Sequence, residues 1–135
     1  MRIAKRYKEN KTMEGYKVTV IEASIELTKK DKIRITDTSD TIAMDKATQD
    51  GELIIDPAYW AVLEVHNEKS QDKDYRNYIV ADKNGLKFRT GSESFWTAFR
   101  SIWDELKDED DWQVKVYRLP SRNRQGKDFL TCSLV

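Results

Sequence analysis

The sequence predicts a mainly β domain that contains one amphipathic helix. Apolar and polar residues alternate along much of the chain, as they do in half-buried strands. Asn84-Gly85 stands between two such runs, which is a strong signal for a β-hairpin. After Gly91 the apolar period changes from two to about 3.6, the period of a helix. A length of 135 residues is usual for one domain.

The segments before the helix predict several strands, some from a clear alternation of apolar and polar residues and others from a weak one. The alternation changes parity at Val20-Ile21, which predicts a bulge or bend in a long first strand. Pro57 separates two later apolar runs, and residues 37–52 show no clear pattern. The predicted strands are 16–27, 33–35, 53–55, 60–66, 75–81 and 86–90.

The helix is predicted over residues 93–107. Ser92 is a good N-cap residue, and Glu93 suits the positive end of the helix dipole. The residues that recur at helical spacing form a broad apolar stripe that must be buried. They are Phe95, Trp96, Phe99, Ile102, Trp103 and Leu106.

Two further strands are predicted after the helix, over 112–119 and 127–135, with a polar turn over 120–126. The predicted order is therefore several strands, a hairpin, one helix and a closing hairpin. It ends in the β-β-β-α-β-β order of an OB-fold, a five-stranded and partly open barrel. We therefore expect an OB-like domain over residues 15–135. Residues 1–14 carry no apolar period and are expected to form a flexible basic arm.

The charges are balanced in number but segregated along the chain. Lys and Arg total 24, as do Asp and Glu, although charged residues make up 36% of the sequence. Residues 2–11 and 115–127 are basic, whereas 104–111 is acidic. A neutral protein of this kind can carry a basic binding surface and an acidic back. No apolar run has the length of a signal peptide or a membrane span, so we expect a cytoplasmic protein.

The residue types that carry catalysis are scarce. One His and one Cys leave little basis for a zinc site or a Cys/His nucleophile, and the five glycines are scattered singly. Cys132 alternates with apolar neighbours, which predicts a buried thiol. The sequence thus predicts no catalytic residue, metal or cofactor, and function through binding.

Aromatic residues and cations alternate in the predicted strands, which is the combination that binds single-stranded nucleic acid. Strand parity places Tyr117 with Lys115, Phe129 with Lys127, and Tyr78 on a polar face, while Trp112 points to the core. The sequence does not distinguish DNA from RNA. The predicted binding residues are Tyr78, Lys87, Arg89, Lys115, Tyr117, Arg118, Arg122, Arg124, Lys127 and Phe129.

Residues 60–135 resemble a known family in three segments: Gly91-Ser92-Glu93-Ser94-Phe95-Trp96, Lys115-Val116-Tyr117-Arg118-Leu119-Pro120-Ser121, and Gly126-Lys127-Asp128-Phe129. The family is that of the small OB-fold single-stranded DNA-binding proteins of phages and conjugative plasmids of Gram-positive bacteria. The resemblance implies DNA coating during replication or conjugative transfer, with oligomerisation. The sequence lacks the Gly/Pro-rich tail and acidic tip of housekeeping single-strand binders, so recruitment through a tail is not expected.

The basic arm is predicted to link copies of the chain. Ile3 and Tyr7 stand four residues apart among its cations and would anchor it on a neighbouring domain. Two other functions stay open. One is a protein-binding adaptor or inhibitor of a mobile genetic element, with Trp96 and Trp103 as exposed anchors. The other is a small enzyme of an unrecognised class.

Overall fold

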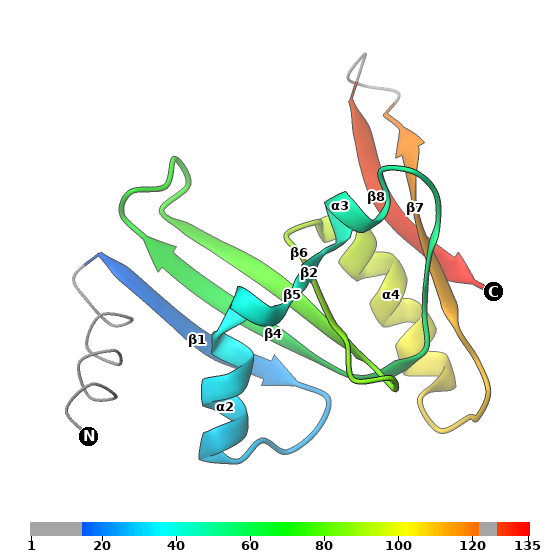
Figure 1. Cartoon of the computed structure of the whole chain (residues 1–135), viewed down its shortest axis with the longest axis horizontal. Helices are drawn as coiled ribbons and strands as arrows, with labels where there is room; N and C mark the ends of the chain where they lie inside the picture. The colour runs from blue at the N-terminus through cyan, green and yellow to red at the C-terminus, as the bar shows by residue number, and fades with distance from the viewer. Residues whose placement is uncertain (1–14, 122–126) are drawn as a thin grey trace.

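The computed structural model describes residues 15–121 and 127–135, which form a mainly β architecture of two sheets (Figure 1). The larger sheet has the strand order β1-β4-β5-β6-β2, and the smaller has the order β3-β7-β8. The strands are β1 (Tyr16–Ala23), β2 (Ile42–Ala43), β3 (Leu53–Ile55), β4 (Pro57–Asn67), β5 (Asp74–Asp82), β6 (Lys87–Thr90), β7 (Val114–Pro120) and β8 (Asp128–Leu134).

Three helices accompany the sheets in the described residues. They are α2 (Lys29–Thr36), α3 (Met44–Ala47) and α4 (Glu93–Leu106), and a 3₁₀ turn occupies Thr38–Asp40. Helix α4 lies against β8, whereas α2 lies near β1 at the other end of the larger sheet (Figure 1). None of these helices is long and apolar enough to cross a membrane.

Strands β3 and β4 are almost one strand, since only Asp56 separates them. Ile55 pairs with Val114 of the smaller sheet, and Trp60 pairs with Val80 of the larger one. The register of β4 shifts between Pro57 and Tyr59. This irregularity changes the parity of the chain, so that Ile55 and Trp60 both point into the same core. A single bent segment therefore joins the two sheets.

The main core lies between α4 and the inner faces of both sheets. Phe95 and Phe99 of α4 are fully buried, as the helical stripe in the sequence predicts. Ser92 caps this helix by accepting a hydrogen bond from the Phe95 amide at 3.1 Å. The sheet residues of this core are Ile55, Trp60, Val62, Tyr78, Val80, Phe88, Val114, Val116, Leu130 and Cys132.

A second, smaller core covers the opposite face of the larger sheet. Ile35 of α2 is buried there against Ala61, Leu63 and Ile79. Because neighbouring residues of a strand point to opposite faces, β4 and β5 are buried on both sides in their central parts. Alternation in sequence therefore does not separate inward from outward positions in these strands.

The barrel is not closed. Of the strands described, β8 pairs only with β7 and does not meet β6 or β2. The start of α4 lies against β8 instead, where the Ser94 hydroxyl donates to the Leu130 carbonyl at 2.6 Å. The expected mainly β domain, with its helix between β6 and β7, is present.

Several predicted elements are confirmed and others are wrong. The β5–β6 hairpin and the bulge in β1, between Val20 and Glu22, are confirmed. The strand predicted over 33–35 is wrong, because these residues belong to α2. The first strand ends at Ala23 rather than at residue 27, and β4 begins at Pro57 itself. The expected arm over 1–14 lies outside the described residues.

Candidate nucleic-acid interface

The outer face of the smaller sheet is the candidate interface. Val114 and Val116 of β7 point to the core, as do Leu130 and Cys132 of β8, so the residues between them face away from it. No described helix or strand lies over that side in Figure 1. We call this surface the β7–β8 outer face. Its residues are Ile54, Lys115, Tyr117, Leu119, Phe129, Thr131 and Ser133.

Two aromatic rings share this face. Tyr117 pairs with Thr131, and Leu119 pairs with Phe129, so Tyr117 and Phe129 are diagonal neighbours across the two strands. The backbones of such diagonal neighbours lie about 7–8 Å apart, so both side chains belong to one small area of the sheet face. Phe129 is 38% exposed and Tyr117 is half-buried. The Tyr117 hydroxyl lies 2.6 Å from the Ser133 hydroxyl, which fixes the ring.

Lys115 adds a cation to the same face. Its ammonium lies 5.9 Å from the centre of the Tyr117 ring and 4.0 Å from a carboxylate oxygen of Glu52. The distance to Glu52 is at the limit of an ion pair, and exposed pairs of this kind contribute little, about 0–1 kcal/mol. Lys115 can therefore exchange this contact for a phosphate. Lys127, just before β8, is exposed.

Lys87 and Arg89 lie elsewhere, on β6 of the larger sheet. Lys87 forms an ion pair with Asp40 at 3.1 Å, and only 14% of its side chain is exposed. Arg89 donates to the Thr41 carbonyl at 3.0 Å and to the Thr41 hydroxyl at 2.9 Å. Both cations thus hold the segment before β2 against the larger sheet and do not adjoin the β7–β8 outer face.

Arg118 also has protein partners. Its guanidinium donates to the Thr48 hydroxyl at 3.1 Å and to the Asp45 carbonyl, and lies 3.8 Å from the Asp45 carboxylate. These contacts tie α3 to β7. The prediction that Arg118 binds nucleic acid is untested, but the side chain would have to leave them first.

Tyr78 is not a surface residue. It is 1% exposed, stacks on Trp96 with ring centres 4.6 Å apart, and donates to Glu93 Oε1 at 2.6 Å. Burial, followed by the hydrogen bond to Glu93, raises the pKa of Tyr78 to about 12. Its placement on a polar face is wrong, because both faces of β5 are covered from Tyr78 onward and only the start of the strand, with Arg76, is exposed. Tyr78 cannot stack on a base without unfolding the core.

The tryptophans of α4 belong to an aromatic cluster. Trp96 meets the Trp60 ring edge-on, with ring centres 5.2 Å apart, and Trp103 meets Trp112 in the same way at 6.0 Å. All but Trp60 are half-buried and pack against the main core. Neither Trp96 nor Trp103 is the exposed anchor that a partner-binding module would require.

Four predicted residues lie outside the described part of the chain. Arg122 and Arg124 lie in the sequence between β7 and β8, and Ile3 and Tyr7 lie before β1. Their proposed roles in binding and oligomerisation therefore stay predictions.

The titratable residues that could carry chemistry are few. The imidazole of His66 lies 2.7 Å from Asp74 and 3.3 Å from Glu68. Both contacts raise the pKa of His66, and the contact with Asp74 has the larger effect. No three His, Cys, Asp or Glu side chains in the described residues are placed to hold a metal ion. Burial raises the pKa of the Cys132 thiol to about 12, so it is neutral at physiological pH.

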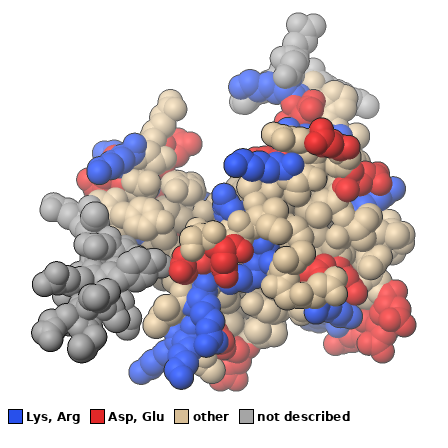
Figure 2. Space-filling model, in the orientation of Figure 1, with Lys and Arg blue, Asp and Glu red and all other residues tan. Residues whose placement is uncertain are grey.

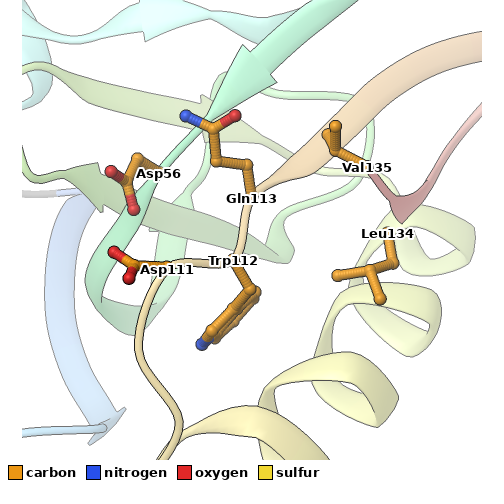
Figure 3. Close-up of a pocket in the computed structure, with 6 residues that line it drawn as sticks. All are labelled: Asp56, Asp111, Trp112, Gln113, Leu134 and Val135. Atoms are coloured by element: carbon orange, nitrogen blue, oxygen red, sulfur yellow. The ribbon is translucent and has the colours of Figure 1, made fainter.

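Two hollows on the surface were not predicted. One, of about 420 Å³, lies between α2 and the β5–β6 turn. The other, of about 380 Å³, lies beyond the C-terminal end of α4 (Figure 3). We call the second the α4-end hollow. Its lining residues are Asp56, Asp111, Trp112, Gln113, Leu134 and Val135. They come from three separate parts of the chain, so no local pattern could have indicated it.

Comparison with known proteins identifies no relative. No protein-family model matches the chain, and no curated protein or solved structure matches it at a significant level.

Proposed function

We propose that the protein binds single-stranded DNA with little sequence preference, and that the β7–β8 outer face is its base-stacking surface. The observation that carries the proposal is the presence of Tyr117 and Phe129 on one uncovered sheet face beside Lys115. The biological role would be DNA coating during phage or plasmid replication or conjugative transfer, as the resemblance implies.

The chemistry of this face suits an unpaired strand. Every base offers a π-face, so stacking on Tyr117 and Phe129 is tolerant of sequence and contributes about 1–3 kcal/mol per base. Lys115 would neutralise a phosphate, and the hydroxyl of Thr131 would contact sugar or phosphate oxygens. Such binding requires no catalytic group, and no enzymatic activity is proposed.

The order of strand pairing supports an OB-type barrel for this function. If β3 and β4 are taken as one bent strand, that strand pairs with both β5 and β7, β5 pairs with β6, and β7 pairs with β8. With α4 between β6 and β7, the order from residue 53 onward is β-β-β-α-β-β, as in an OB-fold. Strand β1, α2, β2 and α3 would then be additions to the barrel.

Fluorescence anisotropy with a labelled oligo-dT strand tests the proposal. Phe129→Ala should weaken binding about 5- to 150-fold, the loss of one stacked base. Phe129→Leu should lose nearly as much if the π-face matters, because leucine restores only apolar area. Tyr16→Ala is the matched control: Tyr16 is 37% exposed, on β1 of the other sheet, and should bind like the unmodified protein.

The dependence on salt provides a second readout. The logarithm of affinity should fall against the logarithm of salt concentration with a slope of about −0.7 per phosphate contact on a single strand. Lys115→Ala should make the slope shallower by about one contact. Equal affinity for single- and double-stranded oligonucleotides, or binding unchanged by Phe129→Ala, would contradict the proposal.

The same face supports an alternative, a protein-binding adaptor or inhibitor module of a mobile element. Ile54 and Leu119 are 46% and 41% exposed on it, and Lys115, the cation of this face, lies near Glu52. Exposed aliphatic side chains favour a protein partner over a nucleic acid. A folded protein that binds no oligonucleotide at low salt would favour this alternative.

A further inference from the structure

The solvent-facing side of α2 is both apolar and basic. Ile35 is 3% exposed in the second core, whereas Ile33, two residues earlier and so about 200° around the helix, is 52% exposed. Lys29 and Lys30 precede Ile33 by four and three residues, which places them beside it on the outward side. Helix α2 thus presents an isoleucine flanked by two ammonium groups.

The one acidic residue of α2 faces away from this side. Asp31 is two residues from Ile33 and closes a capping box with Thr28, accepting a hydrogen bond from the Thr28 amide at 3.0 Å. Lys32 and Arg34, on the flanks of the helix, are also exposed. The outward side of α2 therefore carries no compensating carboxylate, and Figure 2 shows basic atoms gathered over this helix.

The α4-end hollow has the complementary character. Leu134 and Val135, which are 49% and 65% exposed, lie on one side of it, and the carboxylates of Asp56 and Asp111 lie on the other (Figure 3). Asp56 Oδ1 is buried and accepts no hydrogen bond from the described residues, although the Lys83 ammonium lies 3.6 Å away. An apolar side chain flanked by cations would satisfy both sides of this hollow.

Further acids surround the hollow. Every residue from Asp108 to Asp111 is an exposed acid, and Asp104 and Glu105 in the last turn of α4 are exposed too. Lys107 is the one cation among them. In Figure 2 these acidic atoms gather at the end of the molecule away from α2. Although the net charge of the chain is zero, cations gather on α2 and acids gather around the C-terminal end of α4.

We propose that the outward side of α2 docks into the α4-end hollow of a second copy of the chain. Ile33 would enter between Leu134 and Val135, with Lys29 and Lys30 against the carboxylates. The occupant is a second copy because Ile35 anchors α2 in its own core, so the helix cannot leave to fill the hollow of its own chain. The contact joins two different surfaces, and so it can repeat head to tail from copy to copy.

The contact is small and electrostatic, which fixes how it should behave. One helix of eight residues covers less than the roughly 1,200 Å² of a stable interface, so association should be weak and dependent on concentration. Salt should weaken it, because the Debye length falls from about 10 Å at 0.1 M salt to about 3 Å at 1 M. The proposal does not rest on DNA binding, since it is measured without nucleic acid.

Sedimentation velocity of the full chain over a range of concentrations tests the proposal. At low salt the mean mass should rise with concentration above the 15.9 kDa of a single chain, and it should not level off at the mass of a dimer. High salt should return the mean mass to that of a single chain. Lys29→Glu with Lys30→Glu should abolish the association, as should Asp108→Lys with Asp110→Lys. Mixing these two variants should restore it, because each then offers the charge that the other requires.

Two further variants control for other causes. Lys69→Glu with Lys73→Glu makes the same change of net charge in the exposed β4–β5 loop and should leave association intact. Ile33→Ser should weaken association without changing charge. A chain that stays single at low salt and high concentration would overturn the proposal. Association that survives both charge reversals would also overturn it. So would association that is lost when residues 1–12 are deleted but persists when Lys29 and Lys30 are replaced by Glu.

Discussion

The imidazole of His66 lies between two carboxylates at the exposed end of the β4–β5 hairpin. Its contacts with Asp74 and Glu68 raise its pKa above the ordinary 6.5. A raised pKa in the folded state means that protonation stabilises the hairpin. This stabilisation is complete below pH 6.5, the unfolded value, and is lost as the pH rises through the folded pKa.

We therefore expect the His66 ring to titrate above 6.5 in an NMR experiment on the folded protein. Asp74→Asn should bring the pKa back towards that value, because Asp74 is the larger cause of the shift. Relative to the intrinsic exchange rate at each pH, the amide protons of the β4–β5 loop should be less protected above the pKa than below it. A wild-type pKa at or below 6.5 would contradict the assignment.

At this scale the sequence predicted positions well only where one face of a strand is uncovered. Alternation placed Tyr117 with Lys115 and Phe129 with Lys127, each on the polar face of its own strand. The pairing of β7 with β8 brings the two rings onto one face of the sheet. The same reasoning misplaced Tyr78, since α4 and α2 cover opposite faces of its sheet. Charge alone also gave no sign that Arg89 donates hydrogen bonds to Thr41, which is 48 positions away in the sequence.

Helix α2 depends on its capping box. Thr28 accepts a hydrogen bond from the Asp31 amide at 3.1 Å, and Asp31 accepts one from the Thr28 amide at 3.0 Å. Thr28→Ala should lower the free energy of unfolding by about 1 kcal/mol, the usual effect of losing a cap. Thr28→Ser, which retains the hydroxyl, should lose little. Urea unfolding of both variants measures the difference, and equal losses would show that the cap is not the cause.

The elements that were predicted correctly carry their signal within a few residues. The Asn84-Gly85 turn, the parity change after Val20 and the stripe of α4 are all local. Alternation at Ile33-Arg34-Ile35 is also local, but it misleads, because in the helix Ile35 is buried and Ile33 faces solvent. The deciding signal is the cap at Thr28. Strand β2 and α3 carry no local signal, because distant side chains hold them in place.

Phe99 joins the parts of the molecule, since it is fully buried where α4 meets the inner faces of both sheets. Phe99→Ala should lower the free energy of unfolding by about 3–5 kcal/mol, as large-to-small changes in a core do. Thr97→Ala, at an exposed position of the same helix, should change it by less than about 0.5 kcal/mol. Because the sheets share this core, tryptophan fluorescence and far-UV circular dichroism should report one transition. Separate transitions would mean that the sheets unfold independently.

For the whole molecule, the order of elements from residue 53 onward was predictable, whereas the order before it and the closure of the barrel were not. The order of strands and helix follows from local patterns. Whether β8 meets β6 depends on two strands about forty positions apart and on the start of α4 against β8, which no sequence pattern reports. The acidic segment over 104–111 was visible in the sequence, but the basic side of α2 was not. Residues 33–35 were predicted as a strand, and Lys29 and Lys30 lay outside every predicted element.

The bent segment from β3 to β4 also limits how this chain can vary in length. Ile55 and Trp60 are five residues apart, so in a regular strand their side chains would point to opposite faces. They reach one core from two sheets only because the irregularity after Pro57 shifts the alternation by one residue. A substitution at an exposed position such as Ala58 leaves that parity intact. An insertion or deletion of one residue reverses it, turning Trp60 to the side of α2. Related chains should therefore differ here in residue type and agree in spacing, whereas the β4–β5 loop is free to lengthen.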